Sequence, residues 1–528
     1  MLLITLSIPK VQSYIAYVLT EDINNKYDTN IDIERVSISF FGNIKLNDAL
    51  IKDHHNDTLI YFNELKTSVQ NVSKINQNKF DLSGVEFEKL VFNLKRYRDE
   101  DDGNLMHFIN KFESKKKETS SEPVNISLSY FSAIDSQFSY VDENISSPTI
   151  VDLQEMTMNL ENININENGV FIDIQQIAGK AGNGLDVQEL AGDFSYTDSA
   201  LKLDQLQLQT AYSNIDADLG FFYENNNMSD FEDQVQLKAK FRSSSINTTD
   251  LKNYYDEFEK NEDLLLCGEL SGTLNNMKWK ETQISGLTNT VIKTQDLQLK
   301  NLIASDRGFL ISGDFEQLAT SYPDLINLLP NLLKDQLPSF LKRLGQVDFK
   351  GNNMISDRKI DIDSKVKTDL GNLNVDAYFL NYSDQNQVSY KGNININNFN
   401  TGKLFELKKL GLTQAVFNID GIGFNTESLN TLINGKIAKI NFNDYEYSNI
   451  TLNGNFNHPV FDGSITSEDE NLDLEFNGLV DVSKSLNQYE FETSIKYADL
   501  FAINWVKRDT LSIFKGKIDV DLKGTTLN

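Results

Sequence analysis

Short runs in which apolar and polar residues alternate recur along almost the whole chain, from about Ile31 to Asn528. Examples are Ile163-Asn164-Ile165, Leu201-Lys202-Leu203 and Leu472-Asp473-Leu474. Side chains on a β-strand point alternately to its two faces, so each run predicts a strand with one apolar and one polar face. A chain that repeats this pattern almost everywhere is expected to build one long apolar surface.

The alternation is interrupted by steps of three residues, from Leu153 to Met156, from Leu160 to Ile163 and from Leu203 to Leu206. In a straight strand such a step would move the buried side chains to the other face. A β-bulge or a tight turn absorbs such a step and bends the sheet. The steps therefore predict a curved sheet.

The chain has 528 residues, more than a single hydrophobic core normally holds, so several domains or an elongated repeat is expected. Glycines beside the alternating runs give a weak internal repeat, in which Gly268–Asn275 resembles Gly516–Asn528. This favours stacked hairpins over separate globular domains. The predicted fold is mainly β: an elongated, curved antiparallel sheet, like a β-solenoid with a groove, and a few short amphipathic helices.

Helical spacing of apolar residues is confined to short segments. One follows Pro9, a second carries Leu105 to Phe112, and a third is expected to be capped by Asp250 and to continue to Phe258. A fourth, from Pro323 to Leu344, is broken by Pro330 and Pro338. It is expected either to cover the groove or to form a plain hydrophobic cap, and its apolar side is represented by Leu325, Leu329, Leu333, Leu337 and Leu341.

The predicted organisation has four parts. Residues 1–30 form a membrane-proximal segment and an amphipathic helix, residues 31–320 a first β-groove region, residues 321–345 the Pro-broken helix, and residues 346–528 a second β-groove region that continues beyond the chain end. Leu2 to Ile8 is apolar but shorter than the roughly 20 residues that span a bilayer, and it lacks the charged start of a signal peptide. It is either a buried first strand or the end of a membrane anchor.

The formal net charge of −28 excludes a general nucleic-acid partner, because phosphate binding needs a cationic surface. It also disfavours a protein that lies broadly on anionic lipid headgroups. Acidic outer strand faces account for the charge by keeping the sheet soluble. The single cysteine, Cys267, permits no intrachain disulfide and is expected to be a buried structural thiol.

No motif predicts an active site. The chain lacks a phosphate-binding loop, a dinucleotide fingerprint, a His-Glu-x-x-His motif and paired cysteines. The adjacent His54 and His55 lie between Asp53 and Asp57, but neighbours on a strand point to opposite faces and would chelate a metal poorly. We therefore predict no catalytic residue, no cofactor and no metal site, and a protein that is not an enzyme.

Several segments together resemble a known family. They are Ile8–Gln12 with the helix that follows, Ile31–Ile33, Phe41–Leu46, Asp53–Ile60, Asn104–Phe112, Gly345–Gly351 and Thr368–Gly371. Their order is similar to that of the TamB-type translocation and assembly module proteins in the AsmA-like group. The match covers most of the chain as a loose pattern, without the full N-terminal transmembrane helix and the C-terminal region usual in TamB.

The resemblance implies a taco-like β-structure with an apolar groove inside and polar strand faces outside. It implies a protein of the bacterial cell envelope, periplasmic and anchored in the inner membrane through an N-terminal anchor, that meets outer-membrane assembly factors of the Omp85 type. Its implied function is to move phospholipid between the inner and outer membranes and to support outer-membrane biogenesis. The residue pattern agrees on one point: acyl chains need a continuous dry path, and burial of each CH₂ group is worth about 0.8 kcal/mol.

Three alternatives remain open. An ordinary β-sandwich or β-helix core would show the same alternation, and a periplasmic scaffold could assist outer-membrane protein assembly by strand addition without lipid transport. A secreted carbohydrate-active β-helix would require clustered carboxylates and exposed aromatic residues in a cleft. The representative lining residues of the predicted groove are Ile163, Ile165, Leu201, Leu203, Val235, Leu237, Ile394, Ile396, Leu472, Leu474 and Phe476.

Overall fold

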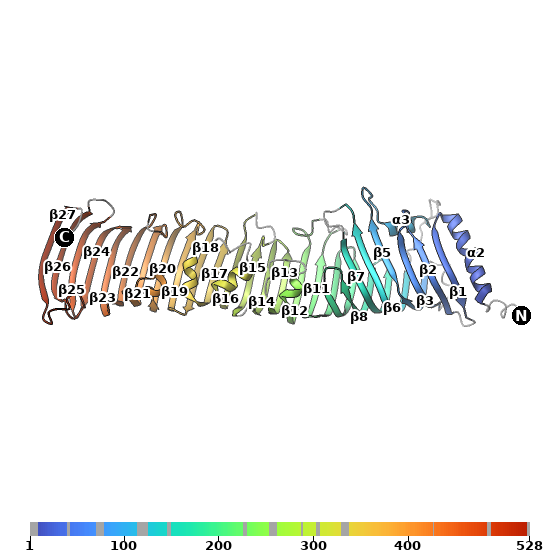
Figure 1. Cartoon of the computed structure of the whole chain (residues 1–528), viewed down its shortest axis with the longest axis horizontal. Helices are drawn as coiled ribbons and strands as arrows, with labels where there is room; N and C mark the ends of the chain where they lie inside the picture. The colour runs from blue at the N-terminus through green and yellow to red at the C-terminus, as the bar shows by residue number, and fades with distance from the viewer. Residues whose placement is uncertain are drawn as a thin grey trace. The chain divides into compact units, whose positions relative to one another are not determined.

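The computed structural model describes residues 9–39, 43–69, 79–112, 125–144, 149–224, 230–252, 261–286, 289–302, 307–328, 337–425, 427–482 and 487–524. These residues contain 27 strands and a few short helices (Figure 1). The predicted mainly β fold of antiparallel strands with few short helices is confirmed. The chain divides into two compact units, which we call unit 1 (Met1–Leu266) and unit 2 (Cys267–Asn528).

Unit 1 contains twelve complete strands and three helices among the described residues, and β13 (Asp263–Thr273) holds the boundary between the units. The strands are β1 (Asn30–Ile38), β2 (Asn43–Lys52), β3 (Thr58–Val69), β4 (Lys79–Glu88), β5 (Val91–Arg96), β6 (Asn125–Asp142), β7 (Thr149–Asn166), β8 (Gly169–Ala181), β9 (Asp186–Thr197), β10 (Ala200–Thr210), β11 (Asn214–Phe222) and β12 (Gln236–Asn247). The helices are α2 (Pro9–Tyr27), α3 (Asn104–Asn110) and α4 (Thr248–Leu251).

Unit 2 contains the remaining strands, and the predicted Pro-broken segment lies inside it. The strands are β14 (Asn276–Gly286), β15 (Thr290–Lys300), β16 (Leu310–Ser321), β17 (Gln346–Ser356), β18 (Lys359–Thr368), β19 (Gly371–Leu380), β20 (Ser389–Asn400), β21 (Leu410–Ile422), β22 (Asn430–Phe442), β23 (Tyr445–Asn457), β24 (Val460–Asp469), β25 (Leu472–Asp481), β26 (Asn487–Asp499) and β27 (Ile513–Gly524). The helical segments are α5 (Tyr322–Leu328), the 3₁₀ helix η3 (Ser339–Leu344) and α7 (Thr401–Phe405).

From β14 to β27, each strand pairs antiparallel with the next one in the chain. Short turns of polar residues make several of these connections. Between β22 and β23 the two turn residues Asn443 and Asp444 have φ angles of 52° and 63°. Two-residue hairpins need this left-handed conformation, which asparagine and aspartate tolerate better than most residues.

The β-bulges predicted from the sequence are confirmed in unit 1. The register shifts between Leu203 and Leu206, and again within β7 on either side of Glu155 and Asn162. At these shifts Glu155, Asn162 and Gln205 have positive φ angles of 51°, 49° and 54°. Each left-handed residue takes up the extra position, so the apolar side chains before and after it stay on the same face.

Unit 1 departs from simple hairpin stacking at β6. Its first half pairs in parallel with β4 and its second half in parallel with β5, while β3 pairs antiparallel with both shorter strands. Parallel neighbours require a crossover connection, and the connection from β5 to β6 includes α3. The crossover places α3 at the strand end where β5 stops.

The predicted amphipathic helix after Pro9 is present as α2, which lies against β1 (Figure 1). Asn24 fixes this contact, because its side chain donates to the Ile31 carbonyl oxygen at 2.7 Å and accepts from the Ile31 amide at 2.9 Å. The helix thereby satisfies backbone groups of β1 that β2 does not pair. Among the residues that the structure describes, no helix is long and apolar enough to cross a membrane.

The other helix predictions have mixed outcomes. The helix predicted from Leu105 is present as α3, but the expected cap of the next helix is wrong: Asn247 caps α4 by accepting from the Thr249 amide. Asp250 lies inside α4 and accepts from hydroxyl groups of Thr210 and Ser213, each at 2.5 Å. The predicted continuation to Phe258 and the apolar segment Leu2–Ile8 lie outside the described residues.

Candidate functional site

The predicted lining residues lie on one face of the sheet in each unit, which we call the apolar face. In unit 2, Val375 of β19 pairs with Ile394 of β20, which pairs with Phe417 of β21. Further along, Leu474 of β25 pairs with Ile495 of β26. Because paired residues point to the same side of a sheet, these pairs form continuous apolar rows.

Unit 1 repeats the arrangement. Leu201 pairs with Tyr196 on one side and Phe221 on the other, and Phe221 pairs with Leu237. The other predicted positions follow the same registers: Leu203 pairs with Phe194 and Leu219, Ile163 with Leu128, and Ile165 with Ile126 and Val170. Val235 directly precedes β12 and is fully buried.

The apolar face of unit 2 is only half-buried along much of its length. Ile394, Leu474 and Phe476 are all of intermediate exposure. On β27 the residues of this face are more open still, with Ile518 37% and Leu522 40% exposed. Side chains between two packed sheets are mostly close to fully buried. These positions on the apolar face of unit 2 therefore resemble the wall of an open groove more than a sandwich core.

The α5–η3 segment of unit 2 crosses the apolar face. Leu325 and Leu337 pack against Phe309. Phe309 lies just before the start of β16, whereas α5 begins just after the end of β16. The contact therefore joins the two ends of that strand. The ring of Phe340 in η3 likewise lies 6.1 Å from the ring of Phe424, which follows the far end of β21.

The predicted Pro-broken segment is therefore present as two short helical segments, α5 and η3, that extend over the face. Leu341 belongs to η3, whereas Leu329 and Leu333 lie outside the described residues.

The opposite face of the sheet in unit 2 is polar. Asn374, Asp376 and Asn393 are exposed there, directly between the apolar residues of β19 and β20. These side chains line a shallow depression of about 700 Å³ that extends from β16 to β21. Its mixed lining of carboxylates, amides and lysines is typical of a solvated strand surface.

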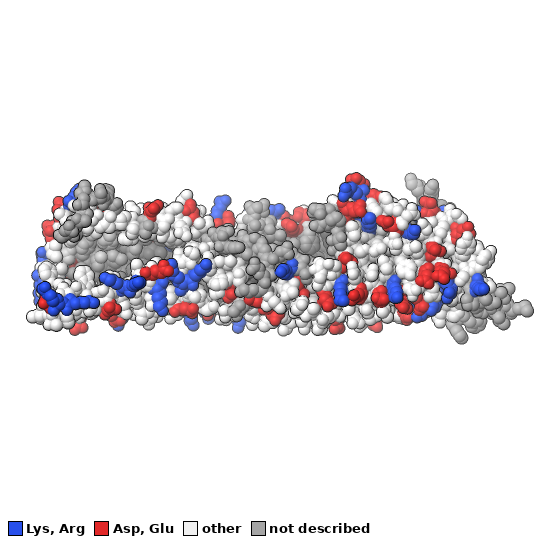
Figure 2. Space-filling view, viewed as in Figure 1, with Lys and Arg blue, Asp and Glu red and all other residues white. Residues whose placement is uncertain are grey.

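One border of unit 2, which we call the α7 rim, exposes apolar and basic side chains together. Trp505 is 64% and Leu511 82% exposed. Hydrogen bonds join its parts, since the Asn443 amide donates to the Lys409 carbonyl oxygen at 2.8 Å and the Asn443 side chain donates to the Asn504 carbonyl oxygen at 3.0 Å. Figure 2 shows Lys and Arg side chains along the lower part of unit 2. The exposed residues of the rim are Phe405, Leu407, Trp505 and Leu511 with Lys403, Lys408, Lys409, Lys507 and Arg508.

A second candidate site lies at one strand end of unit 1, where three of the chain's four histidines meet. The Nε2 atoms of His54 and His55 lie 2.9 and 2.8 Å from the two carboxylate oxygens of Glu100. His107 of α3 brings its Nε2 to 3.5 Å from Glu100, and its ring centroid lies 4.2 Å from that of His54. We call these four residues the histidine cluster.

The reasoning from strand geometry is wrong for this pair of histidines. His54 and His55 lie in the turn between β2 and β3, not on a strand, so both rings can reach the same carboxylate. The turn is held by Asp53, whose carboxylate accepts from the backbone amides of His55 and Asp57 at 2.9 and 3.0 Å. No alternation rule predicts the direction of a side chain in such a turn.

Asp53 is buried and connects the turn to the rest of the site. It also accepts from the Tyr97 hydroxyl at 2.8 Å and from the Asn104 side chain at 3.1 Å. Burial alone would raise the pKa of Asp53, but the hydrogen bonds from Asn104, from Tyr97 and from the turn amides outweigh it, so the pKa is lowered. Asp53 therefore stays ionised and anchors the turn at neutral pH.

The remaining contacts fix the rings and the carboxylate. Tyr97 packs against the His55 ring with a centroid distance of 3.9 Å, and burial with hydrogen bonds to Asp57 and Asp53 raises its pKa. The hydrogen bond from His55 is the main cause that lowers the pKa of Glu100, and the hydrogen bond from His54 lowers it further. Burial of Glu100 acts in the opposite direction but does not outweigh these bonds. The site therefore presents an ionised carboxylate between imidazole rings.

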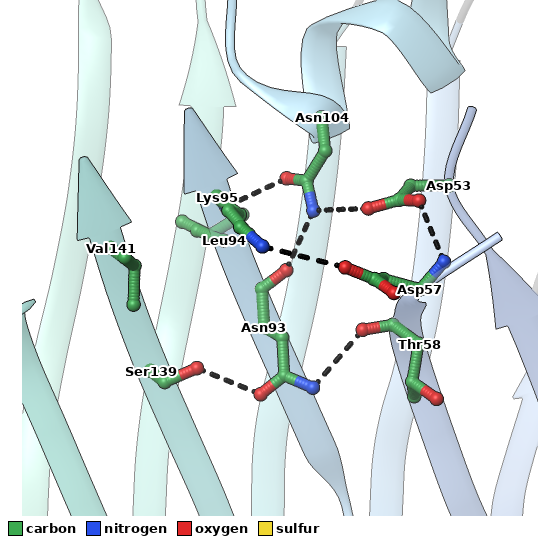
Figure 3. Close-up of a pocket in the computed structure, with 9 residues that line it drawn as sticks. All are labelled: Asp53, Asp57, Thr58, Asn93, Leu94, Lys95, Asn104, Ser139 and Val141. Atoms are coloured by element: carbon green, nitrogen blue, oxygen red, sulfur yellow. Dashed lines mark hydrogen bonds and ion pairs between the residues drawn. The ribbon is translucent and has the colours of Figure 1, made fainter. Parts of the chain in front are cut away.

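Beside the histidine cluster lies a polar pocket of about 310 Å³ (Figure 3). Asn93 donates to the Thr58 carbonyl oxygen at 3.0 Å and accepts from Ser139 at 2.7 Å, while Lys95 lies 3.4 Å from Asp57. Figure 3 shows Asn104 bridging the upper part of this network to Asp53. The polar pocket residues are paired with one another, so the network connects β3, β5, β6 and α3.

The sequence contained only a partial signal for the histidine cluster. The adjacent histidines stood out, but Glu100 and His107 are more than 40 residues further along the chain. Only the crossover that places α3 beside the β2–β3 turn brings them together. Compared with protein-family models, with curated proteins and with solved structures, the chain has no match.

Proposed function

We propose that this chain is a non-enzymatic lipid conduit of the bacterial cell envelope, which carries phospholipid between the inner and outer membranes and supports outer-membrane biogenesis. The observation that carries the proposal is the apolar face of unit 2, whose registered rows run from β17 to β27 and stay half-exposed at positions such as Ile394, Leu474, Phe476 and Ile518. Water in contact with such a face is unfavourable by about 25 cal/mol per Å². An acyl chain that lies along the rows removes that contact.

Two further features fit a phospholipid. The α5–η3 segment crosses the apolar face and shields part of it from water, while the strand surface on the other side stays polar. At the α7 rim, exposed Trp505 and Leu511 occur with the exposed lysines Lys408, Lys409 and Lys507, whereas Arg508 is paired with Asp509 at 3.1 Å. The chain as a whole is strongly acidic. Aromatic, aliphatic and basic side chains in one place are suited to the boundary between acyl chains and anionic headgroups.

The resemblance to TamB-type proteins in the order of sequence segments supports the same function, and with it a periplasmic location, an inner-membrane anchor and Omp85-type partners. These stay proposals of the same kind. A scaffold that binds unfolded outer-membrane proteins by strand addition is the alternative, and the experiment below separates the two.

The test uses a photo-reactive benzoylphenylalanine placed at Ile394 or at Leu474 in the full chain. Matched controls carry it at the neighbouring Asn395 or Glu475, which point to the polar side. Each variant is mixed with vesicles of phosphatidylethanolamine and phosphatidylglycerol, irradiated and analysed by intact-mass spectrometry.

We expect phospholipid adducts at the apolar positions, at least tenfold above those at the polar positions. Equal labelling at both sets, or no lipid adduct at either, would contradict a conduit. Adducts with an added unfolded outer-membrane polypeptide in place of lipid would favour the scaffold.

A further inference from the structure

We propose that the histidine cluster of unit 1 is a binding site for a divalent metal ion of the zinc class, with His54, His55 and Glu100 as ligands and His107 as the fourth. This site is independent of the apolar face and of lipid transport. Imidazole nitrogens and a carboxylate oxygen are a donor set that zinc accepts, whereas magnesium and calcium prefer oxygen ligands alone.

The distances between the donor atoms suit one ion. One ligand atom each from His54, His55 and Glu100 lies within 4.8 Å of the others. The ligand atoms of a tetrahedral zinc site are roughly 3.4 Å apart, given bond lengths of about 2.1 Å. The three donor atoms would have to approach one another by no more than about 1.4 Å to reach that spacing. The His107 Nε2 atom, 3.5 Å from Glu100, would complete the set.

A second observation also points to a ligand. The His54 Nδ1 and His107 Nε2 atoms are inaccessible to solvent and form no hydrogen bond among the residues that the structure describes, although His107 Nε2 lies 3.5 Å from the Glu100 carboxylate. Buried polar atoms are normally paired, because an unmet polar group costs about 1–3 kcal/mol. Coordination would satisfy His107 Nε2 directly. An ion can approach from solvent, since the His55 side chain is 46% exposed.

The surrounding contacts hold the ligands in place before any ion arrives. Asp53 fixes the turn that carries both adjacent histidines, and Asn104 fixes the start of α3 by accepting from the Lys95 amide at 2.9 Å. The carbonyl oxygen of Glu100 accepts from the Arg96 side chain at 3.0 Å, which positions the loop. Supporting hydrogen bonds of this kind orient metal ligands and raise affinity.

A bound ion would join the β2–β3 turn, the loop after β5 and helix α3. Its role would therefore be structural, because binding to the folded state alone shifts the unfolding equilibrium towards the folded protein. Four protein ligands would leave no open position for a reacting water molecule.

The test begins with the purified full chain, stripped with EDTA and dialysed. Zinc chloride alone is titrated by calorimetry, and bound zinc is counted by elemental analysis. We expect one zinc ion per chain, no competition from millimolar magnesium, and a zinc-dependent rise in the thermal unfolding midpoint. The double variant His54→Ala/His55→Ala is expected to bind at least 100-fold more weakly, and Glu100→Gln about tenfold more weakly.

The matched controls are His458→Ala, which removes the one histidine outside the cluster, and Cys267→Ser, which removes the only thiol. Both should bind zinc like the original chain. A second readout needs no variant, so misfolding of a variant cannot affect it. Cobalt(II) added to the original chain should give the visible absorption bands of a tetrahedral site, without a thiolate band. The proposal is overturned if the stripped chain binds no zinc, if the double variant binds equally well, if magnesium competes, or if either control loses the site.

Discussion

Unit 1 and unit 2 use the same alternating pattern but bury its apolar side to different degrees. In unit 1 the first strands pack a true core, in which Ala49, Phe62, Leu90 and Ala133 are almost completely buried. In unit 2 a buried cluster of Tyr382, Val388 and Tyr390 lies at one end of β19 and β20, while Ile394 further along β20 remains half-exposed. The difference shows that alternation sets which side is apolar, while neighbouring strands and covering segments decide whether that side is a core or an accessible wall.

The largest difference in the free energy of unfolding is expected when an aspartate is placed on the apolar side of the sheet in each unit. Ala133→Asp puts a carboxylate where exposure is 0%, which should destabilise unit 1 by about 4 kcal/mol or more. Ile394→Asp lies on the half-exposed face of unit 2 and should cost about 1 kcal/mol while it abolishes lipid labelling nearby. Hydrogen exchange followed by mass spectrometry reports each unit separately.

Asn393→Asp, on the polar side of β20, is the control and should change neither property. A cost at Ile394 as large as that at Ala133 would mean that unit 2 also has a closed core.

A smaller effect is expected at the glycines of the apolar face in unit 2. A side chain at Gly463 would come within 2.5 Å of the Gly454 Cα atom and 2.4 Å of the Asn453 carbonyl oxygen. Gly463→Val should therefore cost about 2 kcal/mol in denaturant unfolding, because the backbone must shift. Gly516→Val lies on the same face, where the nearest atom is 3.4 Å away, and should be close to neutral. Equal costs would mean that close strand approach is not the reason for the glycine.

The bulges of unit 1 offer the next comparison. Gln205 has a φ of 54°, a conformation that costs an ordinary residue about 1 kcal/mol and a β-branched residue more. Gln205→Val should therefore lower the free energy of unfolding by about 1–2 kcal/mol, whereas the exposed neighbour in regular strand, Gln207→Val, should not lower it. The two variants are compared by urea unfolding, and similar values would show that the bulge is not strained.

The smallest effect concerns acid stability. Hydrogen bonds from Lys45 and Lys66 lower the pKa of Glu64 in unit 1 from 4.5 to about 2. Because the folded pKa lies below the unfolded one, this stabilisation is fully present above pH 4.5 and is lost as the pH falls towards 2.

Glu64→Gln should therefore flatten the loss of stability between pH 4.5 and 2, measured by unfolding at a series of pH values. Glu475→Gln in unit 2 removes an exposed carboxylate paired with Lys496, and solvent should screen its effect. An equal change in both variants would contradict the difference in burial.

The sequence by itself determined the strand content, the side of each strand that is apolar, and the bulges near Leu153, Leu160 and Leu203. These are local properties, because side-chain direction follows the backbone repeat and a three-residue step must be absorbed where it occurs. For this reason the representative lining residues lie together on one face in each unit.

Tertiary structure alone decided the rest. The crossing of the α5–η3 segment depends on contacts such as Phe340 with Phe424, which are far apart in the chain. The histidine cluster depends on a turn and on the β5–β6 crossover, where no repeating pattern fixes side-chain direction. Local periodicity determines which side chains a strand places on each of its faces. Long-range packing determines which other segments contact those side chains.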